Sequence, residues 1–174
     1  MRHAFGTTFD VDGVYLNTPS IGVPPRPVVD AVSTAVTAWG RAETSAPQFD
    51  GAVATARTSF AQLTGFPTSS VALGTTVSGL LGLVAASLPP GARVLTADRE
   101  FTSVTFPFVS AGHEVVEVDL DELPERTGAA DVVAVSVVAS VDGGLVDLAA
   151  LRAEVGPDTL VVLDATQSDR KSVV

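Results

Sequence analysis

The sequence predicts an α/β fold: a three-layer sandwich in which helices cover both faces of a mostly parallel sheet. Two observations lead to this prediction. Short runs rich in β-branched residues alternate with helical patterns along the chain, the order that a parallel sheet with crossover helices requires. Two of these runs, 131–138 and 160–163, are almost continuously apolar, as expected for strands buried between two helix layers.

Two helices are predicted in the first third of the chain, after a strand-like run at 13–17 that ends in turn residues. Prolines introduce the first helix, and its apolar face recurs at spacings of three and four residues. That face comprises Val28, Val29, Val32, Val36 and Trp39. The second helix covers 49–63 and ends at Gly65. Its predicted inward-facing residues are Val53, Ala56, Phe60 and Leu63.

Strands and helices alternate in the rest of the chain. A short strand at 71–73 precedes a glycine-containing turn and an apolar helix at 77–88, and a crossover helix is predicted at 145–155. The other predicted strands are 93–97, 113–118, 131–138 and the run that ends at Asp164. These elements together predict the parallel sheet.

Several polar and aromatic residues are expected to have structural roles only. The acidic stretch 119–125 reads as a solvated loop or short helix. Phe106 and Phe108 are expected in the core, and His113 at the surface where a strand begins.

The composition excludes several classes of function. The 174 residues include no cysteine, so disulfides and cysteine-ligated metals are excluded, and His3 and His113 are too few for a histidine-rich metal site. A net charge of −10 argues against non-specific nucleic-acid binding, which needs a basic face. No apolar run approaches the ~20 residues of a membrane helix, and the first residues lack the apolar core of a signal peptide. We therefore expect a soluble cytoplasmic protein without a nucleic-acid or membrane partner.

Asp164 ends the last apolar run, and its position allows two interpretations. A carboxylate at the tip of a buried strand is costly unless it has a partner, and in parallel sheets ligands bind at this end of the strands. Alternatively, Asp164 caps a following helix by accepting hydrogen bonds from the backbone N–H groups just after it. The spacing leaves both interpretations open.

The five residues from Asp164 to Ser168 resemble the D-A-x-Q-S signature of class V aminotransferases. These are fold-type I pyridoxal 5'-phosphate (PLP) enzymes and include cysteine desulfurases, kynureninases and isopenicillin-N-epimerase-like proteins. The resemblance implies that Asp164 pairs with the protonated pyridine nitrogen of PLP and that Gln167 bonds its phenolic oxygen. An anion beside the nitrogen keeps it protonated, so that the ring can accept electrons.

Two further stretches resemble the same family, in the same order along the chain. The Y-L-N-x-P-S-x-G run at 15–22 resembles the loop that leads into the first helix and borders the substrate pocket, which implies a substrate-binding role for Asn17. The Gly74-Thr75-Thr76 run precedes an apolar helix, where the family has its phosphate loop, so the resemblance implies that Thr75 and Thr76 hold phosphate. Helix N-termini favour anions, although simple capping by either threonine is the alternative.

Two more cofactor contacts follow from the resemblance. Phe101 stands where the family carries the aromatic residue that stacks on the pyridine ring, a histidine in the desulfurases. Ser140 aligns, through Gly143, with the polar residue that contacts the phenolic oxygen or the substrate.

The lysine that carries PLP as a Schiff base in this family is expected well beyond Asp164. Lys171 is the only lysine and lies too close, so we expect no catalytic residue of this kind in the chain. Residues 169–174 resemble the in-frame translation of a sequencing adapter. We expect 1–168 to be the N-terminal part of a PLP-binding large domain and 169–174 to be a non-native tail. A genuine short protein with an unusual tail is the alternative.

The resemblance implies a PLP-dependent enzyme that acts on an amino acid or a derivative by transamination, β-elimination such as C–S cleavage, or epimerisation. It also implies a homodimer at full length and little activity for the chain alone. One alternative is a non-catalytic Rossmann-like domain that binds a nucleotide or a partner; it is disfavoured because no G-x-G-x-x-G follows a strand. Another is an inactive paralogue that pairs with a full-length partner.

Overall fold

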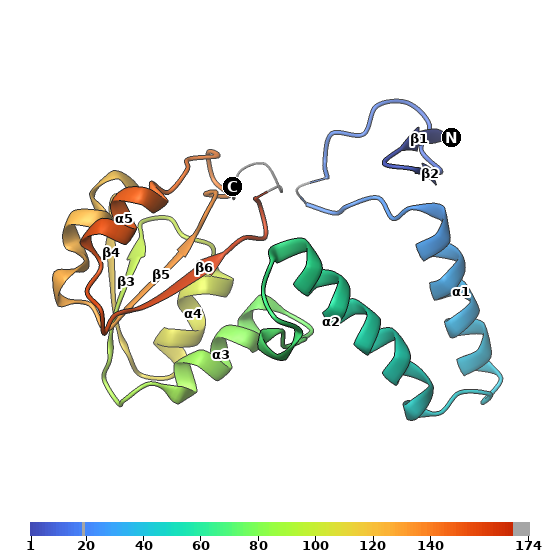
Figure 1. The fold of residues 1–174 in the computed structure, drawn as a ribbon. Coiled ribbons are helices and arrows are strands. Elements are labelled where there is room, and N and C mark those ends of the chain that lie inside the picture. Colours follow the sequence, from blue (N-terminus) through green and yellow to red (C-terminus); the bar gives the residue numbers. More distant parts are fainter. Residues whose placement is uncertain (19, 169–174) are drawn as a thin grey trace. The chain divides into compact units, whose positions relative to one another are not determined.

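The computed structural model describes residues 1–18 and 20–168, which belong to two compact units (Figure 1). The first unit is Met1–Leu73, and the second begins at Gly74. The predicted tail at 169–174, including Lys171, lies outside the described residues. The assignment of 1–168 to one larger domain stays a prediction. No helix in the described part of the chain combines the length and apolar character needed to cross a membrane.

The first unit begins with a hairpin that the sequence analysis missed. Strands β1 (Arg2–Ala4) and β2 (Thr7–Phe9) pair antiparallel, with Ala4 opposite Thr7. Phe5 and Gly6, which connect them, have φ angles of 52° and 72°. A two-residue type I′ turn requires positive φ at both positions. Phenylalanine is uncommon at such a position, and the sequence therefore carried no strong turn signal here.

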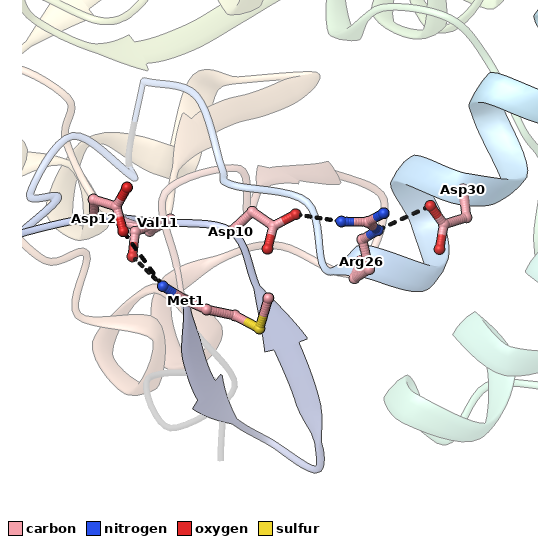
Figure 2. A network of polar contacts seen from close by, with 6 residues as sticks. All are labelled: Met1, Asp10, Val11, Asp12, Arg26 and Asp30. Carbon is pink, nitrogen blue, oxygen red and sulfur yellow. Dashed lines mark hydrogen bonds and ion pairs between the residues drawn. The ribbon is translucent and has the colours of Figure 1, made fainter.

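A network of charged side chains ties the residues after the hairpin to the start of helix α1 (Arg26–Gly40), as Figure 2 shows. The guanidinium of Arg26 donates to Asp10 (2.7 Å) and Asp30 (2.9 Å), and the Met1 ammonium lies 3.4 Å from Asp12. The hydrogen bond to Asp10, followed by that to Asp30, raises the pKa of Arg26 above its ordinary value. These groups are exposed, so solvent screens their attraction.

The strand predicted at 13–17 is wrong, because this segment is a loop closed by its own hydrogen bonds. The Tyr15 hydroxyl donates to the Ile21 carbonyl over 2.8 Å, and the carbonyl of Asn17 accepts from the backbone N–H groups of Ser20 and Ile21. The strand predicted at 71–73 is also absent. Val71 is buried there, and its carbonyl accepts a hydrogen bond from Arg57.

Both helices predicted in the first unit are present, but their predicted burial is wrong. Helix α2 (Asp50–Thr64) follows the short 3-10 helix η1 (Ala46–Phe49), precedes a second one, η2 (Thr68–Ser70), and ends at Gly65 with φ of 78°. The residues expected to face inward are all exposed, and among both helices only Ala61 is buried. An amphipathic pattern selects a helix, but its face becomes buried only where another layer packs on it. Two helices and a hairpin do not supply such a layer.

The second unit confirms the predicted fold class. Its four strands are all parallel and lie in the order β4-β3-β5-β6, with β5 in the centre as predicted (Figure 1). The strands are β3 (Arg93–Ala97), β4 (Glu114–Val118), β5 (Val132–Ser136) and β6 (Leu160–Asp164). The helices are α3 (Val77–Ser87), α4 (Thr102–Ser110) and α5 (Leu148–Glu154). The acidic stretch after β4 forms the 3-10 helices η3 (Leu120–Glu122) and η4 (Pro124–Ala129).

Helices cover both faces of this sheet, and a separate apolar cluster lies on each face. On one face, Val94 and Val132 pack with Phe108 of α4 and with residues of α3. On the other face, Val133 and Val135 pack with Leu151 of α5 and with Leu123. Successive residues of a strand point to opposite faces, so the apolar run of β5 fills both clusters.

Three predictions about individual burial in the second unit are wrong. Strand β6 is not buried on both faces: Leu160 and Leu163 are 43% and 42% exposed, because β6 pairs with β5 on one side and forms an edge of the described sheet. Phe106 is 65% exposed, whereas Phe108 is fully buried as predicted. His113 is half-buried rather than at the surface, with its Nε2 2.9 Å from the Ala85 carbonyl oxygen.

Candidate functional site

The order of the strands identifies where a ligand would bind on the second unit. The chain passes from β3 through α4 to β4 on one side of β3, and the next strand, β5, pairs with the other side. Open α/β sheets bind ligands at such a reversal, in the crevice outside the carboxyl ends of the two strands. The candidate site therefore lies beyond Ala97 of β3 and Ser136 of β5.

The two strands that flank this crevice separate before they end. The ladder between β3 and β5 pairs Val94 with Val132 and Leu95 with Val133. Pairing between β3 and β4 continues to Ala97, and pairing between β5 and β6 continues to Ser136 and Asp164. The sheet is thus open between the carboxyl ends of β3 and β5, where a small cavity of about 30 Å³ is lined by residues that include Ala97, Glu100 and Ser136.

Glu100 lies across this opening, a role that the sequence analysis missed. Its Oε2 accepts a hydrogen bond from the backbone N–H of Ser136 over 2.7 Å. Its Oε1 accepts from the Ser136 hydroxyl over 2.6 Å and from the backbone N–H of Phe101 over 2.7 Å. Ser136 is only 4% exposed, so its polar groups need partners within the protein. The available signal was a carboxylate just beyond a buried strand.

Asp164 ends β6, directly opposite Ser136 in the strand register. Its Oδ1 accepts hydrogen bonds from the backbone N–H of Thr166 (2.9 Å) and from the Thr166 hydroxyl (2.5 Å). Residues 165–168 form a turn and not a helix, so Asp164 caps no helix within the described part of the chain. Asp164 and Gln167 are both half-buried.

Phe101 occupies the N-cap position of α4 and is 56% exposed. Its side chain is therefore not part of the core, unlike that of Phe108 on the same helix. Phe101 follows Glu100 directly, and the Glu100 carboxylate bonds both the backbone N–H of Phe101 and that of Ser136 at the tip of β5. The structure thus connects Phe101 to the candidate crevice through its backbone.

The two threonines before α3 have different environments. Thr76 caps this helix, because its hydroxyl oxygen accepts a hydrogen bond from the backbone N–H of Gly79 over 3.0 Å. Its O–H can still donate, so capping does not exclude the predicted contact with phosphate. Thr75 is exposed, in a bend. The first N–H groups of α3 have no acceptor within the helix, as at any helix N-terminus, so an anion is favoured there.

The two remaining predicted site residues lie elsewhere. Ser140 is exposed in the turn at 139–144, where the Ala139 N–H donates to the Gly144 carbonyl over 2.8 Å. The neighbours of Ser140, Ala139 and Val141, line the small cavity. Asn17 belongs to the first unit, whereas the six predicted cofactor contacts all belong to the second. Of those six, Phe101 is linked to Ser136 through Glu100, and Asp164 lies opposite Ser136 in the strand register. Gln167 lies in the turn that follows Asp164, and Thr75, Thr76 and Ser140 lie in other loops.

This sheet, with its helices and its crevice, defines an α/β protein with the fold of PLP-dependent transferases. The chain is similar to the cysteine desulfurase CsdA of Escherichia coli, with 22% identity and a TM-score of 0.69 over 88% of this chain and 45% of that one. It is also similar to the cystine C–S lyase C-DES, with 17% identity and a TM-score of 0.74 over 88% and 47% of the two chains.

A third solved structure is the histidinol-phosphate aminotransferase of Sinorhizobium meliloti in complex with pyridoxal-5'-phosphate. It has 22% identity and a TM-score of 0.65, over 81% of this chain and 40% of that one. The chain thus spans somewhat less than half the length of these structures. At such identities the likeness establishes the fold alone. No family model and no curated protein matches the chain.

Proposed function

We propose that this chain is the amino-terminal part of a PLP-dependent enzyme of the class V aminotransferase type, acting on an amino acid or a derivative of one. The observation that carries the proposal is the position of Asp164, a half-buried carboxylate at the end of a parallel strand next to the crevice, in a chain with the fold of PLP-dependent transferases. The sequence around it, from Asp164 to Ser168, matches the family signature.

The residues of the second unit fit a PLP group in the chemistry that they offer. Asp164 supplies a carboxylate for a protonated pyridine nitrogen, and Phe101 supplies an exposed aromatic face. The N-terminus of α3 and the hydroxyl of Thr75 supply donors for a phosphate. The lysine that would hold the group covalently is not among the described residues, and Lys171 lies outside them.

When bound, PLP would supply an electron sink for a carbanion formed at the substrate α-carbon. The chain's own residues would prepare and orient it. Asp164 would hold the proton on the pyridine nitrogen, because an anion nearby favours the charged form of that group. Phe101 would fix the plane of the ring, with a stacking contribution of about 0.5–1.5 kcal/mol beyond area burial.

The remaining predicted contacts would set the position of the cofactor and the substrate. Gln167 would donate to the phenolic oxygen, Ser140 would contact that oxygen or the substrate, and Thr75 with Thr76 would bind the phosphate. Asn17 would border the substrate pocket. Transamination, β-elimination and epimerisation remain three candidate reactions, because the groups that select among them lie mostly in the part of the fold that this chain does not include. We propose a homodimer for the full-length enzyme.

PLP binding by the 174-residue chain tests the proposal. We expect the ring absorbance of added PLP to shift on binding, and we expect pyridoxal without phosphate to bind more weakly. Borohydride reduction followed by peptide mapping should find no specific label on Lys171, because that residue is too close to Asp164 to be the family's lysine. A chain that folds but leaves the PLP spectrum unchanged would contradict the proposal and favour a non-catalytic α/β binding domain.

A further inference from the structure

We infer that Glu100 is a positioning residue: its carboxylate fastens the loop between β3 and α4 to the tip of β5 and so fixes the direction of Phe101. The inference rests on the proposed function in one respect, since Phe101 faces a cofactor only if that proposal holds. The fastening itself follows from three hydrogen bonds that meet at one carboxylate.

The first step is the opening of the sheet at this point. The ladder from β3 to β5 ends at Leu95 and Val133, so the N–H of Ser136 has no ladder acceptor on β3. Glu100 Oε2 accepts that N–H over 2.7 Å and takes the place of a strand carbonyl. Hydrogen bonds to an ionised acceptor are roughly twice as strong as neutral ones. Glu100 therefore bridges the two strands where their backbones no longer do.

The second step is that only a carboxylate satisfies this arrangement. All three partners of Glu100 are donors: the Ser136 N–H, the Ser136 hydroxyl and the Phe101 N–H. An ionised carboxylate is acceptor-only, so both oxygens serve. Glutamine of the same shape would place an N–H2 group against at least one donor. An acceptor-only group is thus the requirement, and an amide of the same length does not meet it.

The third step concerns Phe101. Its side chain is 56% exposed, so packing within the protein restrains its direction only weakly. Its backbone is held on both sides: its N–H donates to Glu100 Oε1, and its carbonyl accepts the first N–H bond of α4, from Val104 over 2.8 Å. Without the bond to Glu100, the N–H side of Phe101 loses its described restraint. The loop before α4 can then move, and the direction of the Phe101 ring is no longer fixed.

The preceding residue turns the chain so that Glu100 can reach back. Arg99 has a φ angle of 54°, in the left-handed region that non-glycine residues rarely adopt. Its guanidinium lies 3.3 Å from Asp98 and 3.5 Å from Asp142, and these side chains line the same small cavity as Glu100. This turn lets the Glu100 carboxylate reach the backbone N–H of Ser136 at the end of β5.

Amide hydrogen exchange of the full 174-residue chain tests the fastening. In Glu100→Gln we expect the amides of Phe101 and Ser136 to exchange about tenfold faster, the effect of losing one charged hydrogen bond. The amide of Val137, which donates to the Asp164 carbonyl, serves as an internal reference and should not change. Asp98→Asn is the matched control, because Asp98 lines the same cavity but its side chain, among the bonds described, pairs only with Arg99 and not with Glu100, Phe101 or Ser136. Ser136→Ala removes one bond and should accelerate the Phe101 amide less.

A PLP titration separates positioning from general stability. We expect Glu100→Gln and Phe101→Ala each to weaken PLP binding several-fold, and the double variant to bind no more weakly than Phe101→Ala. Additive losses in the double variant would overturn the positioning role. Unchanged exchange at Phe101 and Ser136 in both Glu100→Gln and Ser136→Ala would overturn the fastening. A wild-type chain that binds no PLP would refute the proposed function, and the exchange result alone would then decide the inference.

Discussion

Asp164 accepts two hydrogen bonds from Thr166, and both are made by the same carboxylate oxygen, Oδ1. The side chain of Asp164 is therefore held by its own turn before any ligand arrives. Such pre-orientation reduces the conformational entropy that binding would otherwise cost. It also separates two roles of this residue, because an amide oxygen can replace Oδ1 in the turn while only a carboxylate can balance a pyridinium charge.

Asp164→Asn should preserve the fold and weaken the cofactor site. The asparagine oxygen still accepts from Thr166, so we expect a melting temperature close to wild type. The lost ion-paired bond, about 1.5–3 kcal/mol, corresponds to about one to two decades in PLP affinity, or in rate for a full-length enzyme. Equilibrium dialysis with PLP measures the effect. Equal PLP affinity in Asp164→Asn and wild type would show that the charge of Asp164 does not contribute to cofactor binding.

Thr75→Val should weaken the binding of PLP but not that of pyridoxal. Thr75 is exposed before the N-terminus of α3, and valine keeps its shape while removing the hydroxyl donor. We expect a several-fold loss of PLP affinity, measured by titration with both compounds. Parallel losses for PLP and pyridoxal would indicate that Thr75 does not contact phosphate.

Thr76→Ala should destabilise the second unit by about 1 kcal/mol, because the hydroxyl that accepts the Gly79 N–H is lost. Thr76→Ser keeps that hydroxyl and should be close to wild type. Urea unfolding, followed by circular dichroism, compares the two variants. If alanine and serine behave alike, the cap is not important for stability.

Phe108→Ala and Phe106→Ala should differ strongly, although the two residues are two positions apart on α4. Phe108 is fully buried, and its truncation should cost about 3–5 kcal/mol. Phe106 is largely exposed, so its truncation should change the free energy of unfolding by no more than about 0.5 kcal/mol. Similar losses in urea would mean that the register of α4 on the sheet is wrong.

Leu160→Lys should reduce aggregation of the chain. Leu160 is an exposed apolar residue on edge strand β6, and unpaired edges of this kind template association between chains. We expect a higher soluble fraction on expression than for wild type. Ala153→Lys adds the same charge to the exposed side of α5 and serves as the control. Equal solubility of both variants would show that the gain does not come from the edge strand.

The four strands of the parallel sheet and the helices α1, α2, α3 and α5 could be predicted because their signals are local. The apolar runs of β3 and β5 and the spacing of apolar residues in α1 are visible within a few residues. Burial was predicted less well, because it depends on the layer that packs on an element. The exposed positions of α2 and the edge position of β6 follow from packing partners, which no local pattern contains.

The candidate site was predicted in part for the same reason. Asp164 and Phe101 could be named because their short stretches resemble a known family, and their contacts with a cofactor stay a prediction. Glu100 could not, because its partner Ser136 lies 36 positions later and the two meet only when β3 and β5 pair. Phe5 and Gly6 were missed because the hairpin turn uses a residue that rarely adopts positive φ.

The pairing of β3 with β5 also has a consequence for folding during translation, because β3 is made before its partner. The backbone N–H of Arg93 bonds the carboxylate of Asp131, 38 positions later, and β4 and its helix lie between them. At translation rates of about 5–20 residues per second, β3 emerges roughly two to eight seconds before its partner. During that interval the side of β3 that β5 will occupy is open to chaperones and to neighbouring nascent chains on the same messenger.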